Sequence, residues 1–141
     1  CRFFNLYGSE QKEDFVIPKF AKNIKTGNPI KVYGDGKQIR SYCHVNDAVN
    51  GIINILQKGK DNSIYNVGND MEPISVLDLA KKMVTISNKK IKIEKIPFEQ
   101  SDRESNREIY RRQPSIEKLK KETGYIPKIK LDEGIKDILT K

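Results

Sequence analysis

Arginine is the residue type best suited to chemistry in this 141-residue sequence. Arg103, Arg107, Arg111 and Arg112 concentrate in one polar stretch late in the chain. A guanidinium group presents a planar fork that binds phosphate through paired hydrogen bonds, whereas a lysine ammonium acts as a point charge. We therefore expect an anionic ligand near this stretch.

Arg40 is the strongest single candidate for binding such an anion. It stands in a strand-like segment with Ile39 and Tyr42. A half-buried charge without a partner is costly, so Arg40 needs an anion close by. The alternative to a ligand is a structural ion pair with Asp35 or Asp47.

Two asparagines lie in strand-like runs near the strand ends, and α/β folds place ligand contacts at an end such as the one after Asn5. Asn5 precedes Tyr7 and Gly8, and Asn66 precedes Gly68. A short amide there can donate a hydrogen bond to a phosphate oxygen or a sugar hydroxyl. The simpler interpretations are a turn-forming role for Asn5 and a loop-pinning role for Asn66.

Tyr33 stands directly before the turn sequence Gly34-Asp35-Gly36. Its ring and the backbone of the turn can hold a nucleotide base. The alternative is a plain β-hairpin turn, because Asp-Gly is a strong hairpin signal. The two glycines are not a dinucleotide fingerprint, since the third glycine and the following helix are absent.

His44 is the one histidine, and a lone imidazole invites a catalytic role. No second soft ligand stands near it in the sequence, so a metal site is not expected. Cys1 and Cys43 are too few for a disulfide scaffold or a zinc cluster, and they suit a reducing cytoplasm.

The net charge of +8 raises the alternative of a basic nucleic-acid or scaffold domain. The lysine pairs argue against it, because they are short, separated and interleaved with acidic residues. They are Lys81-Lys82, Lys89-Lys90 and Lys120-Lys121. We expect a solvated surface without nucleic acid. No run of about 18 apolar residues predicts a membrane span.

Alternating short strands and amphipathic helices predict an α/β fold in a single domain, residues 1–141. The expected strands cover residues 2–7, 30–33, 38–43, 63–67 and 90–96. One expected helix carries Val16, Ile17, Phe20 and Ile24 at helical spacing. Others follow Asp47, Ser75 and Ser115, with a last one over residues 132–140. Residues 97–113 lack any period and predict a long loop.

Helix caps support these boundaries. Asp47 and Ser115 are the expected N-caps of two helices, and Ser75 with Asp78 resembles a capping box. Gly27 is the expected stop signal of the helix near residue 16.

Three motifs together resemble a known family. They are RFFNLYG at residues 2–8, PIKVYGDGKQIRSYCHVND at residues 29–47 and YNVG at residues 65–68. They are similar to the carboxyl-terminal part of extended short-chain dehydrogenase/reductases, in the group of NAD-dependent nucleotide-sugar epimerases, dehydratases and decarboxylases. The resemblance runs from the first residue to nearly the last. We find no Gly-rich dinucleotide fingerprint and no catalytic Tyr-x-x-x-Lys pair.

The resemblance implies the substrate-binding lobe of an extended Rossmann-type enzyme, without its N-terminal cofactor-binding portion. Residues 2–6 and 38–57 are then expected to pack on that NAD-binding domain. Because the sequence starts at Cys1 instead of Met, we expect it to begin inside a longer protein. The chain alone is expected to be inactive and not to bind NAD.

The resemblance also implies roles for individual residues. The residue matching Phe3 lies beside the nicotinamide in similar enzymes, and those matching Asn5 and Asn66 face the sugar nucleotide. The residue matching Arg40 binds the diphosphate. His44, in the family's His-Val-x-Asp pattern, serves packing and hydrogen bonding.

Arg112 matches the arginine of an Arg-x-Pro-Asp/Ser-Ile element that reaches the phosphate end or a sugar acid. This element is nearer to the decarboxylase and some epimerase branches than to the 4,6-dehydratases. Which of Arg111 and Arg112 faces the ligand stays open.

The function implied is oxidation of a UDP- or dTDP-sugar at C4 by NAD, through a 4-keto intermediate. Representative reactions are those of UDP-glucose 4-epimerase, UDP-glucuronate decarboxylase and dTDP-glucose 4,6-dehydratase. The expected partners are a nucleotide-diphosphate sugar and the NAD-binding domain, and a homo-oligomer is compatible with both. A non-catalytic nucleotide-sugar-binding module is the alternative.

Overall fold

The computed structural model describes residues 1–98 and 109–140. The helices are α1 (Val16–Thr26), α2 (Val45–Lys58), α3 (Val76–Ser87), α4 (Glu117–Thr123) and α5 (Leu131–Thr140). The strands are β1 (Arg2–Phe3), β2 (Leu6–Tyr7), β3 (Ile30–Tyr33), β4 (Ile39–Ser41), β5 (Cys43–His44), β6 (Asn66–Val67), β7 (Pro73–Ser75), β8 (Ile93–Ile96) and β9 (Arg111–Arg112). The predicted α/β fold class is confirmed.

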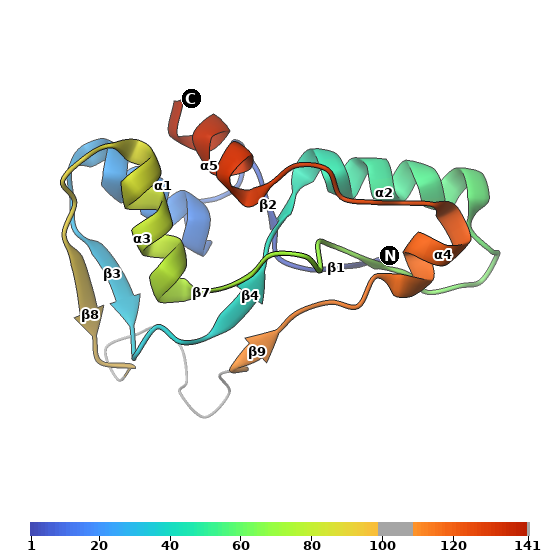
Figure 1. Ribbon diagram of the computed structural model, residues 1–141, viewed down its shortest axis with the longest axis horizontal. Helices are drawn as coiled ribbons and strands as arrows, with labels where there is room; N and C mark the ends of the chain where they lie inside the picture. The colour runs from blue at the N-terminus through green and yellow to red at the C-terminus, as the bar shows by residue number, and fades with distance from the viewer. Residues whose placement is uncertain (99–108, 141) are drawn as a thin grey trace.

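The described strands form four small sheets. Three of them are parallel pairs, β1–β6, β2–β5 and β3–β8. In the fourth sheet β4 is central, antiparallel to β7 and parallel to β9. Figure 1 shows α1, α3, β3 and β8 at one end of the long axis, and α2 with α4 at the other.

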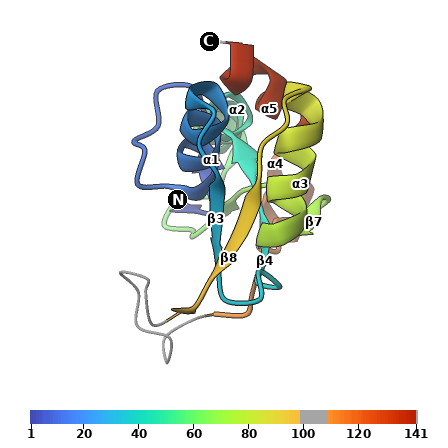
Figure 2. The same ribbon diagram turned by 90° about the vertical axis from the view of Figure 1, so that its left-hand side faces the viewer.

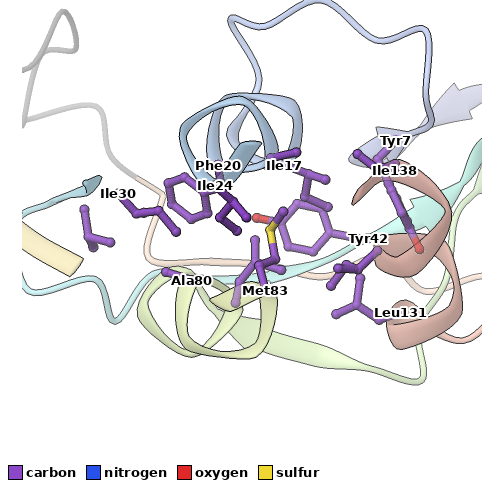
Figure 3. Close-up of a cluster of buried hydrophobic side chains, with 14 residues drawn as sticks. Tyr7, Ile17, Phe20, Ile24, Ile30, Tyr42, Ala80, Met83, Leu131 and Ile138 are labelled. Carbon is purple, nitrogen blue, oxygen red and sulfur yellow. The ribbon is translucent and has the colours of Figure 1, made fainter. Parts of the chain in front are cut away.

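The first core lies between α1, α3, α5 and strand β3 (Figure 3). Ile17, Phe20 and Ile24 recur along one face of α1 and are buried, as their helical spacing predicts. Figure 2 shows α1 and α3 covering the same side of the β3–β8 pair. Accordingly β3 alternates, with Val32 buried and Lys31 exposed.

The second core joins α2 to α4 and β6. Its buried members are Cys43, Ala48, Tyr65, Val67, Ile116, Leu119 and Tyr125. Gly51 permits the close approach of α2, because a Cβ there would lie 3.1 Å from Val67 and 3.3 Å from Tyr125.

The caps of two helices differ from prediction. The Ser75 hydroxyl accepts the Asp78 N–H at 3.0 Å, so the predicted N-cap at Ser75 is confirmed. The Asp78 carboxylate accepts a hydrogen bond from the Ser75 hydroxyl at 2.7 Å. Asp47 is not the N-cap of α2; His44 is, and its Nδ1 accepts the Asn46 N–H at 3.2 Å. Ser115 is not a cap either, because α4 begins one residue later without a side-chain cap bond.

Two strand predictions also require correction. The Gly34-Asp35-Gly36 turn is not a hairpin, because β3 pairs with β8 while β4 pairs with β7 and β9. The predicted strand 2–7 is interrupted at Asn5, whose φ of 42° lies in the left-handed region. The predicted loop 97–113 contains β9, and its residues 99–108 lie outside those described.

Across the described residues, none of the helices combines the length and the apolar character that crossing a bilayer requires.

Candidate functional site

A cavity of about 610 Å³ lies between α1, β3, β4 and the segment that joins β1 to β2. Five of the six residues singled out from the sequence line it: Phe3, Asn5, Tyr33, Arg40 and Arg112. They come from four separate segments of the chain, because Phe3 and Asn5 share one. The fold therefore gathers most of the predicted site into one place.

Arg40 and Arg112 lie directly opposite one another. They are register partners on the parallel strands β4 and β9. Register partners project to the same face of a sheet, and like charges directly opposite destabilise it. Two guanidinium groups at the wall of one cavity therefore create a strong preference for an anion there.

The environment of each arginine is distinct. Arg40 is half-buried on the central strand, and its Nη1 donates to the Ile39 carbonyl at 2.8 Å. Arg112 is more exposed, and its guanidinium lies 6.0 Å from the centroid of the Phe4 ring, a cation–π distance. A cation–π contact with the Phe4 ring orients the Arg112 guanidinium without using its N–H groups as hydrogen-bond donors.

Arg111 faces elsewhere. It lines a second, shallow cavity together with Tyr110, and its Nη2 donates to Gln113 Oε1 at 2.7 Å. Of the neighbouring arginines, Arg112 is thus the one at the large cavity. Arg103 and Arg107 lie outside the described residues.

The two acids considered as structural partners of Arg40 make other contacts. Asp47 Oδ2 accepts the backbone N–H groups of Lys128 and Ile129, at 3.1 and 2.9 Å. Asp35 accepts the Lys37 N–H at 2.9 Å and the Tyr110 hydroxyl at 2.9 Å. Asp47 thereby ties α2 to the segment that leads into α5.

Asn5 has the turn-forming role considered for it, and its ligand-binding role stays a prediction. Its left-handed backbone makes the turn between β1 and β2, and its Nδ2 donates to the Ser41 carbonyl at 3.0 Å. The same residue lines the cavity.

Tyr33 is the last residue of β3 and lines the same cavity. Lys19 Nζ lies 5.8 Å from the centroid of its ring. The adjacent Gly34 has a φ of 66°, and a Cβ there would lie 2.5 Å from Phe98 Cδ2. Glycine is therefore required beside the Phe98 ring, which also lines the cavity.

Asn66 is placed apart from the other five. It is not among the residues lining the large cavity, and its Nδ2 donates to the Ser115 carbonyl at 3.0 Å. This contact pins the chain just before α4, as the simpler interpretation expects. A ligand-facing role for Asn66 stays a prediction.

The cavity wall includes residues that sequence reasoning passed over. Gln38 and Tyr7 line it although both are almost fully buried. The Tyr7 hydroxyl has no hydrogen-bond partner among the described residues, and burial, with the charge of Glu72 nearby, raises its pKa. No local sequence pattern assigns either residue to the cavity.

The Tyr-x-x-x-Lys spacing does occur once, at Tyr33 and Lys37, which corrects the statement that it is absent. The two residues are separated by a turn, whereas a helical turn would place them on one face. Tyr33 lines the large cavity and the exposed Lys37 lines the shallow one. The pair is therefore not arranged for joint proton transfer.

His44 is buried and packs edge-on against Tyr7, with ring centroids 5.3 Å apart. Together with its role as the α2 N-cap, this gives the imidazole the structural task inferred for it. In the described part of the chain, no three His, Cys, Asp or Glu side chains gather as a metal site requires.

Comparison with known proteins finds one family to which this chain is similar. The model of the NAD dependent epimerase/dehydratase family matches residues 1–68. The UDP-N-acetyl-alpha-D-glucosaminuronate decarboxylase of Bacillus cytotoxicus is 32% identical over 141 residues, which cover 98% of this chain and 44% of the relative. Residues 1–68 of this chain match that family's model, and the whole chain is similar to part of a decarboxylase and of a 4,6-dehydratase.

Solved structures of the epimerase/dehydratase family have the same fold. The dTDP-glucose 4,6-dehydratase of Bacillus anthracis, in complex with NAD, has a TM-score of 0.86 and 26% identity over 99% of this chain and 42% of that one. The UDP-glucose 4-epimerase of Thermotoga maritima, with UDP-glucose, has a TM-score of 0.83 and 26% identity, covering 99% and 43%. The chain thus spans less than half the length of these relatives.

Proposed function

We propose that this chain is the nucleotide-sugar-binding part of an NAD-dependent epimerase or dehydratase acting on a UDP- or dTDP-sugar through a 4-keto intermediate. The observation that carries the proposal is the pairing of Arg40 with Arg112 across β4 and β9, at the wall of one cavity. Two opposed guanidinium forks suit a diphosphate, which offers each of them its own phosphoryl group.

The rest of the cavity suits the rest of such a ligand. Tyr33 and Phe98 provide aromatic surface for a base on the side of β3, and Asn5 provides an amide for the sugar on the side of β1. The cavity volume of about 610 Å³ lies within the range typical of small-molecule sites. Arg40 and Arg112 would then fix the ligand between its two ends.

The described residues do not by themselves form a dinucleotide site. Gly34 and Gly36 lie in a turn between two strands, whereas a pyrophosphate needs the N-terminus of a helix behind such glycines. Of the residues named here, only Phe3 is assigned to the nicotinamide, and it is 45% exposed. NAD and the hydride step therefore belong to the whole enzyme, and this chain alone is expected to show no turnover.

The surface of the molecule supports docking of a cofactor-binding portion onto residues 2–6 and 38–57. Helix α2 buries one face in the second core, yet its opposite face is also apolar. That face consists of Val45, Val49, Ile53 and Leu56, all exposed. Parallel strands are usually covered on both faces, and both residues of β1 are exposed.

The free cysteines are compatible with a cytoplasmic protein.

The proposal is tested by titrating uridine diphosphate into the isotope-labelled chain and following amide chemical shifts. Each charge-assisted contact contributes roughly 1.5–3 kcal/mol, so Arg40→Ala should weaken binding about ten- to a hundredfold. Arg40→Lys should restore only part of the affinity, because the planar fork is lost. Arg111→Ala is the matched control and should bind like the unmodified chain.

Equal affinity of Arg40→Ala and the unmodified chain, with a lower melting temperature of the variant, would make Arg40 a structural residue and defeat the proposal. Binding of uridine diphosphate without any turnover in the longer enzyme would favour a non-catalytic module. Salt-sensitive binding of duplex DNA, with no response to uridine diphosphate, would favour the basic nucleic-acid or scaffold alternative.

A further inference from the structure

Strand β9 carries Arg112 but has little of its own to hold it in place. It consists of two residues, and of the described strands only β4 pairs with it. So short an edge strand makes few ladder hydrogen bonds, and its position depends on the residues that flank it. The orientation of Arg112 toward Arg40 is therefore decided by contacts outside the cavity.

The upstream flank is fastened twice by Tyr110. Its hydroxyl donates to Asp35 Oδ2 at 2.9 Å, and its carbonyl accepts the Ile39 N–H at 2.8 Å. Side chain and backbone of one residue thus bind both ends of the turn between β3 and β4. Neither Asp35 nor Tyr110 lines the large cavity.

Asp35 is a fixed anchor for this contact. Its other carboxylate oxygen, Oδ1, accepts the Lys37 N–H at 2.9 Å, which locks the side chain onto its own turn. That bond and the one from Tyr110 lower the pKa of Asp35, so the carboxylate stays charged at neutral pH. A charged acceptor makes the stronger hydrogen bond to the Tyr110 hydroxyl.

The downstream flank is fastened separately. Gln113 Nε2 donates to the Asp70 carbonyl at 2.9 Å, and Pro114 beside it is buried. Tyr110 and Gln113 therefore bracket β9, and removal of one leaves the other in place. A change at Tyr110 should loosen the strand without unfolding the domain.

We propose that Asp35 and Tyr110 are positioning residues that hold Arg112 opposite Arg40, and that they thereby set the affinity of the cavity for a diphosphate. This inference rests on the proposed function. Neither residue touches the ligand. Their hydrogen bond restricts the motion of β9, so that the second guanidinium is ordered before the ligand arrives.

The test compares Tyr110→Phe, which removes only the hydroxyl, with the unmodified chain in titrations with uridine diphosphate. The dissociation constant should rise roughly three- to tenfold, the size expected for one ordinary hydrogen bond, because the Tyr110–Asp35 bond is exposed and does not itself contact the ligand. In an Arg112→Ala background the same change should have no further effect, since there is no guanidinium left to position. Asp35→Asn should act in the same direction as Tyr110→Phe.

Lys37→Ala is the matched control. Lys37 Nζ lies 3.8 Å from Asp35 Oδ2, and its removal takes a charge from the same carboxylate while it leaves the Tyr110 hydroxyl in place. Its affinity should equal that of the unmodified chain. The melting temperature of Tyr110→Phe should change little, because the hydrogen bond is exposed.

A second measurement needs no ligand. Heteronuclear relaxation of the Arg111 and Arg112 backbone amides should show greater motion in Tyr110→Phe than in Lys37→Ala. Unchanged relaxation, or equal weakening of binding with and without Arg112, overturns the inference. Failure of the unmodified chain to bind uridine diphosphate would instead count against the proposed function, and the relaxation result would still decide the positioning role.

Discussion

Burial gives individual side chains of this chain properties that their residue types alone do not have. Cys43 is fully buried and its Sγ lies 3.8 Å from the Tyr125 hydroxyl. Burial raises the pKa of the Cys43 thiol from 9.0 to about 11. The thiol is therefore protonated and unreactive at neutral pH, which fits a packing role and leaves Cys1 as the exposed cysteine.

The raised pKa of Cys43 predicts that the free energy of unfolding falls at alkaline pH. Between the unfolded pKa of 9.0 and the folded value of about 11, the unfolded chain has lost the thiol proton and the folded chain retains it. Fewer bound protons in the unfolded state mean that stability decreases as pH rises. The loss from Cys43 should be about 1 kcal/mol between about pH 8 and about pH 10.

Urea denaturation across this pH range checks the prediction. Cys43→Ala should lower stability at every pH but flatten its dependence on pH, whereas Cys1→Ala should keep the original slope. Tyr7 and Tyr125, whose pKa values burial also raises, add their own loss above about pH 10. A Cys43→Ala variant with an unaltered slope would show that the thiol does not control this dependence.

At the scale of elements, the helices were predictable because their signals are local. Apolar residues at helical spacing located α1, and the left-handed Gly27 ends it as predicted. The Ser75 cap needed only the residues that follow it. Strand pairing was not predictable in this way, because the partner of β4 on one side, β9, lies far along the chain. The hairpin signal at Asp35-Gly36 was local and was overridden by these distant partners.

The same distinction explains which parts of the site could be predicted. Arg40, Arg112 and Asn5 came from motifs whose residue types carry their chemistry. Gln38 and Tyr7 joined the cavity through packing between distant segments, which no local pattern records. The misplaced cap at Asp47 has a similar cause, since its carboxylate bonds the segment before α5 instead of its own helix.

The two serines expected to cap helices allow a matched test of element stability. Ser75 Oγ accepts the Asp78 N–H at 3.0 Å, whereas α4 has no side-chain cap bond. Ser75→Ala should therefore lower the free energy of unfolding by about 1 kcal/mol, and Ser115→Ala should change it by less than about 0.5 kcal/mol. Urea denaturation of both variants distinguishes them. Equal losses of unfolding free energy in the two variants would mean that the hydrogen bond from Asp78 N–H to Ser75 Oγ does not stabilise α3.

At the scale of the whole molecule, the two hydrophobic cores differ in how completely the helices around them are covered. Helices α1, α3 and α5 enclose the first core, while α2 presents apolar side chains both to the second core and outward (Figure 1). A helix that is apolar on two faces is normally buried. The chain also spans only 44% of the length of its decarboxylase relative, so the outward face is where we expect further protein to pack.

Without that protein, the outward face of α2 should cause self-association of the 141-residue chain. Contiguous exposed apolar surface favours contacts between copies, and Leu56, which is 81% exposed, offers the most of it. Sedimentation velocity should show an average mass that rises with concentration. Leu56→Lys should suppress the rise, because a charge in the contact must be desolvated.

Gln57→Lys is the control for this effect, since it adds the same charge at the neighbouring exposed position of α2 outside the apolar face. It should associate like the unmodified chain. Equal suppression by both variants would assign the association to net charge, and a monomer at every concentration would mean that the face is too small to drive it. Suppression by Leu56→Lys alone would show that the chain self-associates through the apolar face of α2. Residues 38–57, which include most of that helix, are proposed to meet the cofactor-binding portion.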